Sequence, residues 1–225
     1  LPLNGTLEST RGDEILPSVE FVGSEGAHFE TYQGLAYDIK NFNLKEGTIS
    51  FELKMDTIPE NPSNRDTERP YGRNVISWVN GDNAMFLAHY IEYQYDTPDC
   101  CRNVGYQVYF ENATNEHKLT TYIVGANQTG TLGPNKIVVT YGEDGTKFFI
   151  KTPNNSSCYL VASDTASRTP IVEPPTDGKF FIGSHDLRAD GSGIGDGDFG
   201  GFAGNLKDFK LLPTQVSDSE AIAMC

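Results

Sequence analysis

Hydrophobic and polar residues alternate through much of the chain. In GTISFELKM, residues 47–55, the apolar Ile49, Phe51, Leu53 and Met55 are separated by polar Ser50, Glu52 and Lys54. Successive side chains of a β-strand point to opposite faces of its sheet, so a period of two is typical of a strand buried on one side. A half-buried strand is therefore predicted over residues 47–55.

Similar segments follow along the chain. Residues 73–96 predict two strands around an Asn80-Gly81 turn, and residues 136–151 predict a hairpin with Asp144-Gly145 at its turn. Three more segments read as single strands, residues 105–112, 117–124 and 179–183. Many short strands with turn signals between them indicate a sandwich or jelly roll.

Helical signals are scarce. The clearest is SDSEAIAM, residues 217–224, where Ser217 and Glu220 have the spacing of a capping box before a short apolar turn. The expected architecture is an all-β, two-sheet antiparallel jelly-roll sandwich with one short C-terminal helical turn. No repeat or linker divides the sequence, so residues 1–225 are expected to form a single domain.

Charge narrows the choice of partners. The 225 residues carry a formal net charge of −14, which would repel nucleic acid and anionic membrane surfaces. The sequence contains no run of about 18 apolar residues. We therefore expect neither a nucleic-acid partner nor membrane insertion.

Features of the sequence favour secretion. It opens on LPLNGT, without an initiator methionine or a charged leader, as a processed secretory protein would. Sequons for N-glycosylation lie in polar, turn-like segments and are expected to carry glycans; they are Asn4, Asn112, Asn127, Asn154 and Asn155. A secreted, extracellular glycoprotein is the expectation.

The four cysteines allow two disulfides in three pairings. Cys100 and Cys101 are adjacent, so they could bridge each other or each reach a distant partner. We predict a disulfide between Cys158 and Cys225 that ties down the C-terminal segment. The spacing does not match a zinc site.

The order of several segments resembles the concanavalin A-like lectin and laminin G-like superfamily. The segments that carry the resemblance are GAHFETYQGLAYDI, LKEGTISFELKM, NVISWVNGDNAMFLAHYI, NKIVVTYGEDGTKFFIK, GKFFIGSHD and FGGFAGNLKDFKLLPTQVSDSEAIAM. The similarity covers roughly residues 25 to 225 and implies a jelly-roll fold. It points to the broad superfamily and to no close subfamily.

The Gly-rich stretch DLRADGSGIGDGDFGG supplies Asp186, Asp190, Asp196 and Asp198 before the last apolar segment. Carboxylate and carbonyl oxygens are the ligands that Ca²⁺ prefers. The resemblance implies a calcium ion held by aspartates of two loops, here Asp196 and Asp198 with Asp82. The alternative is a solvated turn, with glycines for backbone freedom.

A tyrosine-rich segment could bind a glycan. In HYIEYQYD, the residues Tyr90, Glu92, Gln94 and Asp96 share one face of a strand. Aromatic rings with a polar tip suit sugars, so the predicted ligand-binding residues are Tyr90, Glu92, Gln94 and Tyr106. These tyrosines could equally fill a core.

The segment HYIEYQYD also suggests two catalytic hypotheses, a glycosidase and a polysaccharide lyase. Glycosidases of the superfamily place paired carboxylates on one strand, but Glu92 and Asp96 would be about 13 Å apart, wider than the ~5–9.5 Å that paired carboxylates require. A polysaccharide lyase acting on an acidic glycan by β-elimination would instead need a base and a charge-neutralising group. Its candidates are His89, Gln94, Arg73 and Tyr109.

The predicted function is a secreted module that binds a glycan or a cell-surface or extracellular protein, with calcium as a possible cofactor. The alternatives are the polysaccharide lyase and a non-catalytic protein-interaction domain. The acidic charge opposes a uronate substrate unless Arg69, Arg73, Arg102 and nearby lysines form a local basic groove.

Overall fold

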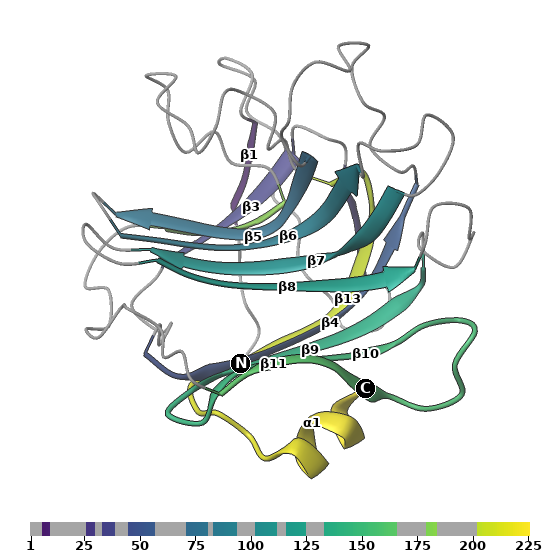
Figure 1. Ribbon diagram of the computed structural model, residues 1–225. Helices are drawn as coiled ribbons and strands as arrows, with labels where there is room; N and C mark the ends of the chain where they lie inside the picture. Colours follow the sequence, from purple (N-terminus) through teal and green to yellow (C-terminus); the bar gives the residue numbers. More distant parts are fainter. Residues whose placement is uncertain are drawn as a thin grey trace.

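The computed structural model shows two antiparallel β-sheets packed face to face, a jelly-roll sandwich with one short helix (Figure 1). The predicted fold class is therefore confirmed. The structure describes residues 6–9, 26–29, 33–38, 45–56, 71–80, 83–93, 102–111, 116–124, 133–165, 179–183 and 202–225. No helix in this part of the chain is long and apolar enough to cross a membrane.

The first sheet has seven strands in the order β1-β3-β12-β5-β6-β7-β8. They are β1 (Thr6–Ser9), β3 (Gln33–Asp38), β12 (Lys179–Gly183), β5 (Tyr71–Asn80), β6 (Asn83–Tyr93), β7 (Arg102–Glu111) and β8 (Glu116–Val124). Asn80 pairs directly with Asn83, so β5 and β6 form the predicted hairpin, but the two linking residues are 81 and 82, one position after the predicted Asn80-Gly81 turn. In Figure 1 the strands of this sheet curve away from the second sheet.

The second sheet has six strands in the order β11-β10-β9-β4-β13-β2. They are β11 (Tyr159–Asp164), β10 (Gly145–Lys151), β9 (Asn135–Gly142), β4 (Gly47–Met55), β13 (Gly204–Leu212) and β2 (Ala27–Phe29). The predicted strand over residues 47–55 is thus present with the predicted limits. The alternation in the sequence does not predict β1 or β11, because TLES and YLVASD contain no clear period of two.

The hairpin between β9 and β10 differs from the prediction by one residue. Gly142 pairs with Gly145, so the turn residues are Glu143 and Asp144, and not Asp144 and Gly145. Gly145 has φ of 85°, and a Cβ there would collide with the carbonyl oxygen of Asp164 on β11. The glycine is therefore required by the close approach of the neighbouring strand as well as by its own backbone.

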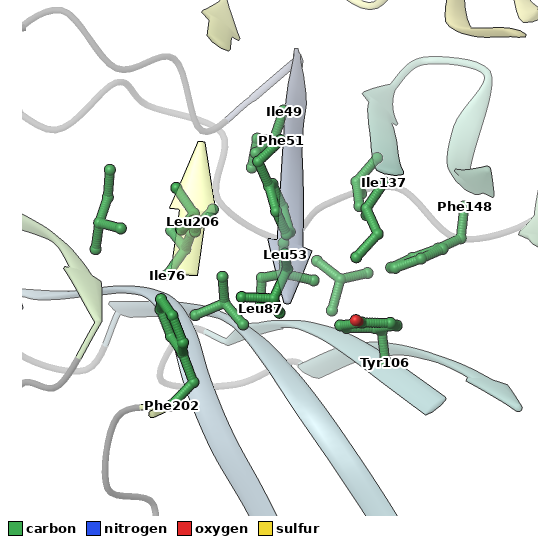
Figure 2. Close-up of a cluster of buried hydrophobic side chains, with 14 of the residues drawn as sticks. Ile49, Phe51, Leu53, Ile76, Leu87, Tyr106, Ile137, Phe148, Phe202 and Leu206 are labelled. Carbon is green, nitrogen blue, oxygen red and sulfur yellow. The ribbon is translucent and has the colours of Figure 1, made fainter. Parts of the chain in front are cut away.

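The core lies between the sheets and is built from one face of each strand (Figure 2). From β4, the alternating residues Ile49, Phe51 and Leu53 point inward and are almost completely buried. Rings from the two sheets meet directly: the centroid of Tyr106 lies 5.6 Å from that of Phe148 and the centroid of Phe110 lies 5.1 Å from that of Tyr141. Each such side chain contributes about 1.5–3 kcal/mol through burial.

A C-terminal segment covers part of the outer face of the second sheet, as Figure 1 shows for α1 (Asp218–Met224). Ala221 of α1 packs on Val138 and Phe149, which point outward from β9 and β10. Ser217 caps the helix and Glu220 completes the predicted capping box. The pKa of Glu220 is lowered because its carboxylate accepts hydrogen bonds from the Ser217 side chain and backbone.

Further contacts fasten this segment to the sheet. The Thr48 hydroxyl donates to the carbonyl of Thr214 and accepts from the amide of Val216. Lys147 on β10 forms an ion pair of 2.6 Å with Asp218. Cys158, just before β11, is bonded to Cys225 after α1, which is the predicted disulfide.

Replacing both Cys158 and Cys225 by serine should lower the free energy of unfolding by about 2–4 kcal/mol, because the bond closes a loop of 67 residues in the unfolded chain. Urea unfolding followed by tryptophan fluorescence would measure the change. An unchanged midpoint in the double variant would contradict this role of the disulfide.

Candidate functional site

Strand β7 shows which face of the first sheet is available to a ligand. Tyr106, Val108 and Phe110 point inward and are fully buried in the core. The alternate residues Gln107 and Tyr109 are partly exposed. Because residues that alternate along a strand lie on opposite faces, Gln107 and Tyr109 occupy the outer face, turned away from the second sheet.

The pairing of the strands extends this outer face across the sheet. Tyr109 is the register partner of Phe86 on β6 and Lys118 on β8, and Gln107 is the partner of Ala88 and Thr120. In Figure 1 this face lies on the inner side of the curve of the sheet. We call the partly exposed Gln107 and Tyr109, together with their register partners, the tyrosine face.

Two of the predicted ligand-binding residues, Tyr90 and Glu92, occupy positions of β6 that alternate in step with Gln107 and Tyr109. Tyr90 pairs with Gly105 and Glu92 pairs with Asn103. Gln94 follows the end of β6 and lies outside the described residues. The sequence-based grouping of Tyr90 with Glu92 is thus consistent with their positions in the sheet.

Tyr106 lies on the other face and is a correction to the predicted ligand set. Its side chain has no exposed surface, its ring stacks on Phe148, and its hydroxyl accepts a hydrogen bond of 3.3 Å from the amide of Asn135. Burial raises the pKa of the hydroxyl well above its usual value, and the bond from Asn135 opposes this only in part. Tyr106 is a core residue and cannot contact a ligand outside the sandwich.

The pairing of β5, β6 and β7 places the predicted lyase residues in different rows of the sheet. Arg73 pairs with His89, and His89 pairs with Tyr106, so all three occupy one row across the sheet, the row of a core residue. Tyr109 is three residues from Tyr106 and lies on the opposite face. In the register, Arg73 and His89 therefore occupy a different row from Tyr109.

Not all of the outer face is accessible. Phe181 and Ser77 are register partners in the row that continues through Phe86 to Tyr109. Both are buried, with 4% and no exposed surface respectively. Among the side chains that the structure describes, the accessible part of this face is therefore at β7.

The predicted calcium ligands Asp82, Asp196 and Asp198 lie outside the described residues. Within the described ranges, no three His, Cys, Asp or Glu residues form a group that could hold a metal ion.

The other predicted sites are only partly described. Asn154 and Asn155 are exposed in the loop between β10 and β11, where they are accessible for glycan attachment. Asn4, Asn112 and Asn127, and the adjacent Cys100 and Cys101, lie outside the described residues.

Comparisons of sequence identify no family. No protein-family model matches the chain, and no curated protein matches it.

Comparisons of structure show that the fold is shared. Domain 4 of AbnA, a GH43 extracellular arabinanase from Geobacillus stearothermophilus solved in complex with arabinotriose, has a TM-score of 0.56 and 10% identity, over 98% of this chain and 87% of that chain. The enzymatically active domain of tailspike protein 2 from bacteriophage CBA120 has a TM-score of 0.62 and 11% identity, over 100% and 30% of the two chains.

NanB sialidase from Streptococcus pneumoniae is a third match, with a TM-score of 0.51 and 14% identity, over 90% of this chain and 27% of that chain. The chain thus spans less than a third of the tailspike and sialidase chains. At these identities the likeness concerns the fold alone.

Tyr106→Phe should lower the free energy of unfolding by about 1–3 kcal/mol, because it removes a buried hydrogen-bond partner of Asn135 while leaving the ring in place. Chemical unfolding would measure the loss. The substitution should leave the exposed surface unchanged, so a variant that folds stably but loses ligand binding would contradict the assignment of Tyr106 to the core.

Proposed function

We propose that the protein is a secreted, glycan-binding module and that it binds sugar on the tyrosine face. The observation that carries the proposal is the pair of partly exposed side chains, Gln107 and Tyr109, on the outer face of β7. Additional support comes from the shared fold with an arabinanase domain that was solved with a bound arabinotriose. The exposed sequons Asn154 and Asn155 and the disulfide support the secreted location.

The chemistry of these residues suits a neutral sugar. A tyrosine ring provides an apolar surface for the C–H face of a pyranose or furanose. A glutamine amide carries hydrogen-bond donors and an acceptor, the groups that pair with sugar hydroxyls.

The corresponding face of the second sheet is a poorer candidate for stacking on sugars. Outward residues in its covered part, among them Thr48, Val138 and Phe149, are already buried beneath the C-terminal segment and α1. A ligand could reach them only after this segment is displaced. The tyrosine face needs no such rearrangement at β7.

Binding without catalysis is the better reading of this site. The lyase set depends on a base and a cation beside Tyr109, whereas Arg73 and His89 share a row with the buried Tyr106. A role in binding a cell-surface or extracellular protein would use the same exposed face, and it is distinguished by the absence of glycan binding.

Tyr109→Ala should weaken binding to the best neutral oligosaccharide on a glycan array by about fivefold to tenfold, since loss of a stacked ring costs about 1–1.4 kcal/mol. Tyr159→Ala is the matched control, because Tyr159 is 37% exposed on β11 of the other sheet. Isothermal titration with the selected oligosaccharide would give the affinities.

Equal losses in the two variants would show that the tyrosine face is not the binding site. No binding to any glycan by the wild type would favour the protein-interaction alternative. Appearance of an unsaturated product, detected by its ultraviolet absorbance, would replace the binding module by a lyase.

We also propose, from the sequence alone, that calcium binds at Asp196 and Asp198. A ligand that binds only the folded state raises the melting temperature, so the wild type should melt higher in calcium than in EDTA. The Asp196→Ala/Asp198→Ala variant should lose this difference, and Asp82→Ala tests whether the third aspartate contributes. Identical melting of the wild type in calcium and EDTA would remove the metal from the proposal.

A further inference from the structure

The outer face of the six-stranded sheet is divided into a covered half and a basic half. In the covered half, Ser50, Val138 and Phe149 form a buried row, and the C-terminal segment and α1 cover Val138 and Phe149. One step along the same strands, the next outward row contains Lys151 on β10, Lys136 on β9, Glu52 on β4 and Lys207 on β13. These four residues, which we call the lysine row, are partly exposed.

Further lysines flank this row. Lys54 lies two residues beyond Glu52 on β4, and Lys210 follows the β-bulge on β13; both are exposed. The face therefore gathers five of the 17 lysine and arginine residues of a chain with a net charge of −14. Such segregation is unexpected for a surface on which charge serves only solubility.

The ion pairs of the described residues leave most of this positive charge uncompensated. Lys207 pairs with Glu52 at 2.8 Å, and that carboxylate raises the pKa of the lysine. Within the part of the chain that the structure describes, no carboxylate lies within ion-pair distance of Lys54, Lys136, Lys151 or Lys210. The carboxylate of Asp56 instead pairs with His28 at 2.7 Å.

One contact in the row is unfavourable by itself. Lys151 and Lys136 are direct cross-strand partners, and like charges in that position destabilise a sheet. An anionic group bound between the two ammonium groups would convert this repulsion into attraction. The arrangement is therefore suited to a ligand that brings negative charge to the row.

We infer that the lysine row, together with Lys54 and Lys210, binds a linear anionic polysaccharide through its sulfate or carboxylate groups. With strands about 4.8 Å apart, the row from Lys151 to Lys207 is about 14 Å long and one residue wide. A thin polymer can follow this row, whereas the chain's net charge of −14 opposes the close approach of a broad anionic surface such as a membrane or a nucleic-acid duplex. The inference does not depend on the tyrosine face.

The test uses heparin as a sulfated probe and polygalacturonate as a carboxylated one, at about 50 mM NaCl, where charges are weakly screened. Lys136→Gln/Lys151→Gln should bind heparin or polygalacturonate about tenfold more weakly than the wild type, with a smaller dependence of affinity on salt. The matched control is Lys45→Gln/Lys147→Gln, which removes the same charge outside the row, and it should change affinity by less than about twofold. Thermal melting verifies that both variants are folded.

Three outcomes would overturn the inference. They are failure of the wild type to bind either polymer, equal losses in the two double variants, and equally tight binding to phosphatidylserine vesicles or to single-stranded DNA. Tyr109→Ala should leave heparin binding unchanged, so failure here is distinguishable from failure of the neutral-sugar site.

Discussion

The whole arrangement depends on the packing of aromatic rings between the two sheets. Tyr106 and Phe110 from β7 meet Phe148 and Tyr141 from β10 and β9. These contacts fix which of the two faces of each strand is turned inward, because a strand cannot bury one residue without turning its neighbour outward. The position of Tyr109 on the outer surface is thus a consequence of the burial of Tyr106 and Phe110.

The outer faces of the two sheets differ in what covers them. Among the described residues, the C-terminal segment packs on the outer face of the six-stranded sheet and not on that of the seven-stranded sheet. Val216, Ala221 and Met224 of this segment pack with Val138 and Phe149. Thr48 and Lys147 supply its polar anchors. The cover ends where Val138 and Phe149 are followed in the next outward row by Lys136 and Lys151. Desolvating the lysines would cost free energy that a short helix could not supply.

Much of the fold can be predicted from the sequence. Alternation determines β4 to the residue, and the hairpins and the helix cap are local signals that tertiary packing does not override. The β9–β10 turn differs from the prediction by one residue. Two glycines, Gly142 and Gly145, flank the turn, whereas the prediction relied on the dipeptide Asp144-Gly145 alone. β11 contains consecutive apolar residues and is recognised only through its pairing with β10.

The candidate sites are harder to predict because they depend on registers between strands. Alternation separates Tyr106 from Tyr109, but it does not say which one faces the other sheet. The lysine row is invisible in the sequence, since Lys136, Lys151 and Lys207 are far apart along the chain and meet only through pairings across four strands. The Cys158 to Cys225 bond could be predicted, as one of three pairings, because Cys225 is the last residue and Cys158 follows the sequons Asn154 and Asn155 in a polar loop.

The position of that disulfide has a consequence for aggregation. β11 is the last strand of its sheet, and it exposes Tyr159 and Leu160, which are 37% and 43% accessible. An edge strand with exposed apolar residues is a template on which another chain can add a strand. Cys158 immediately precedes Tyr159, so the covalent bond holds the start of this strand in place. In a reducing medium the edge would open locally before the sandwich unfolds, and self-association would begin there.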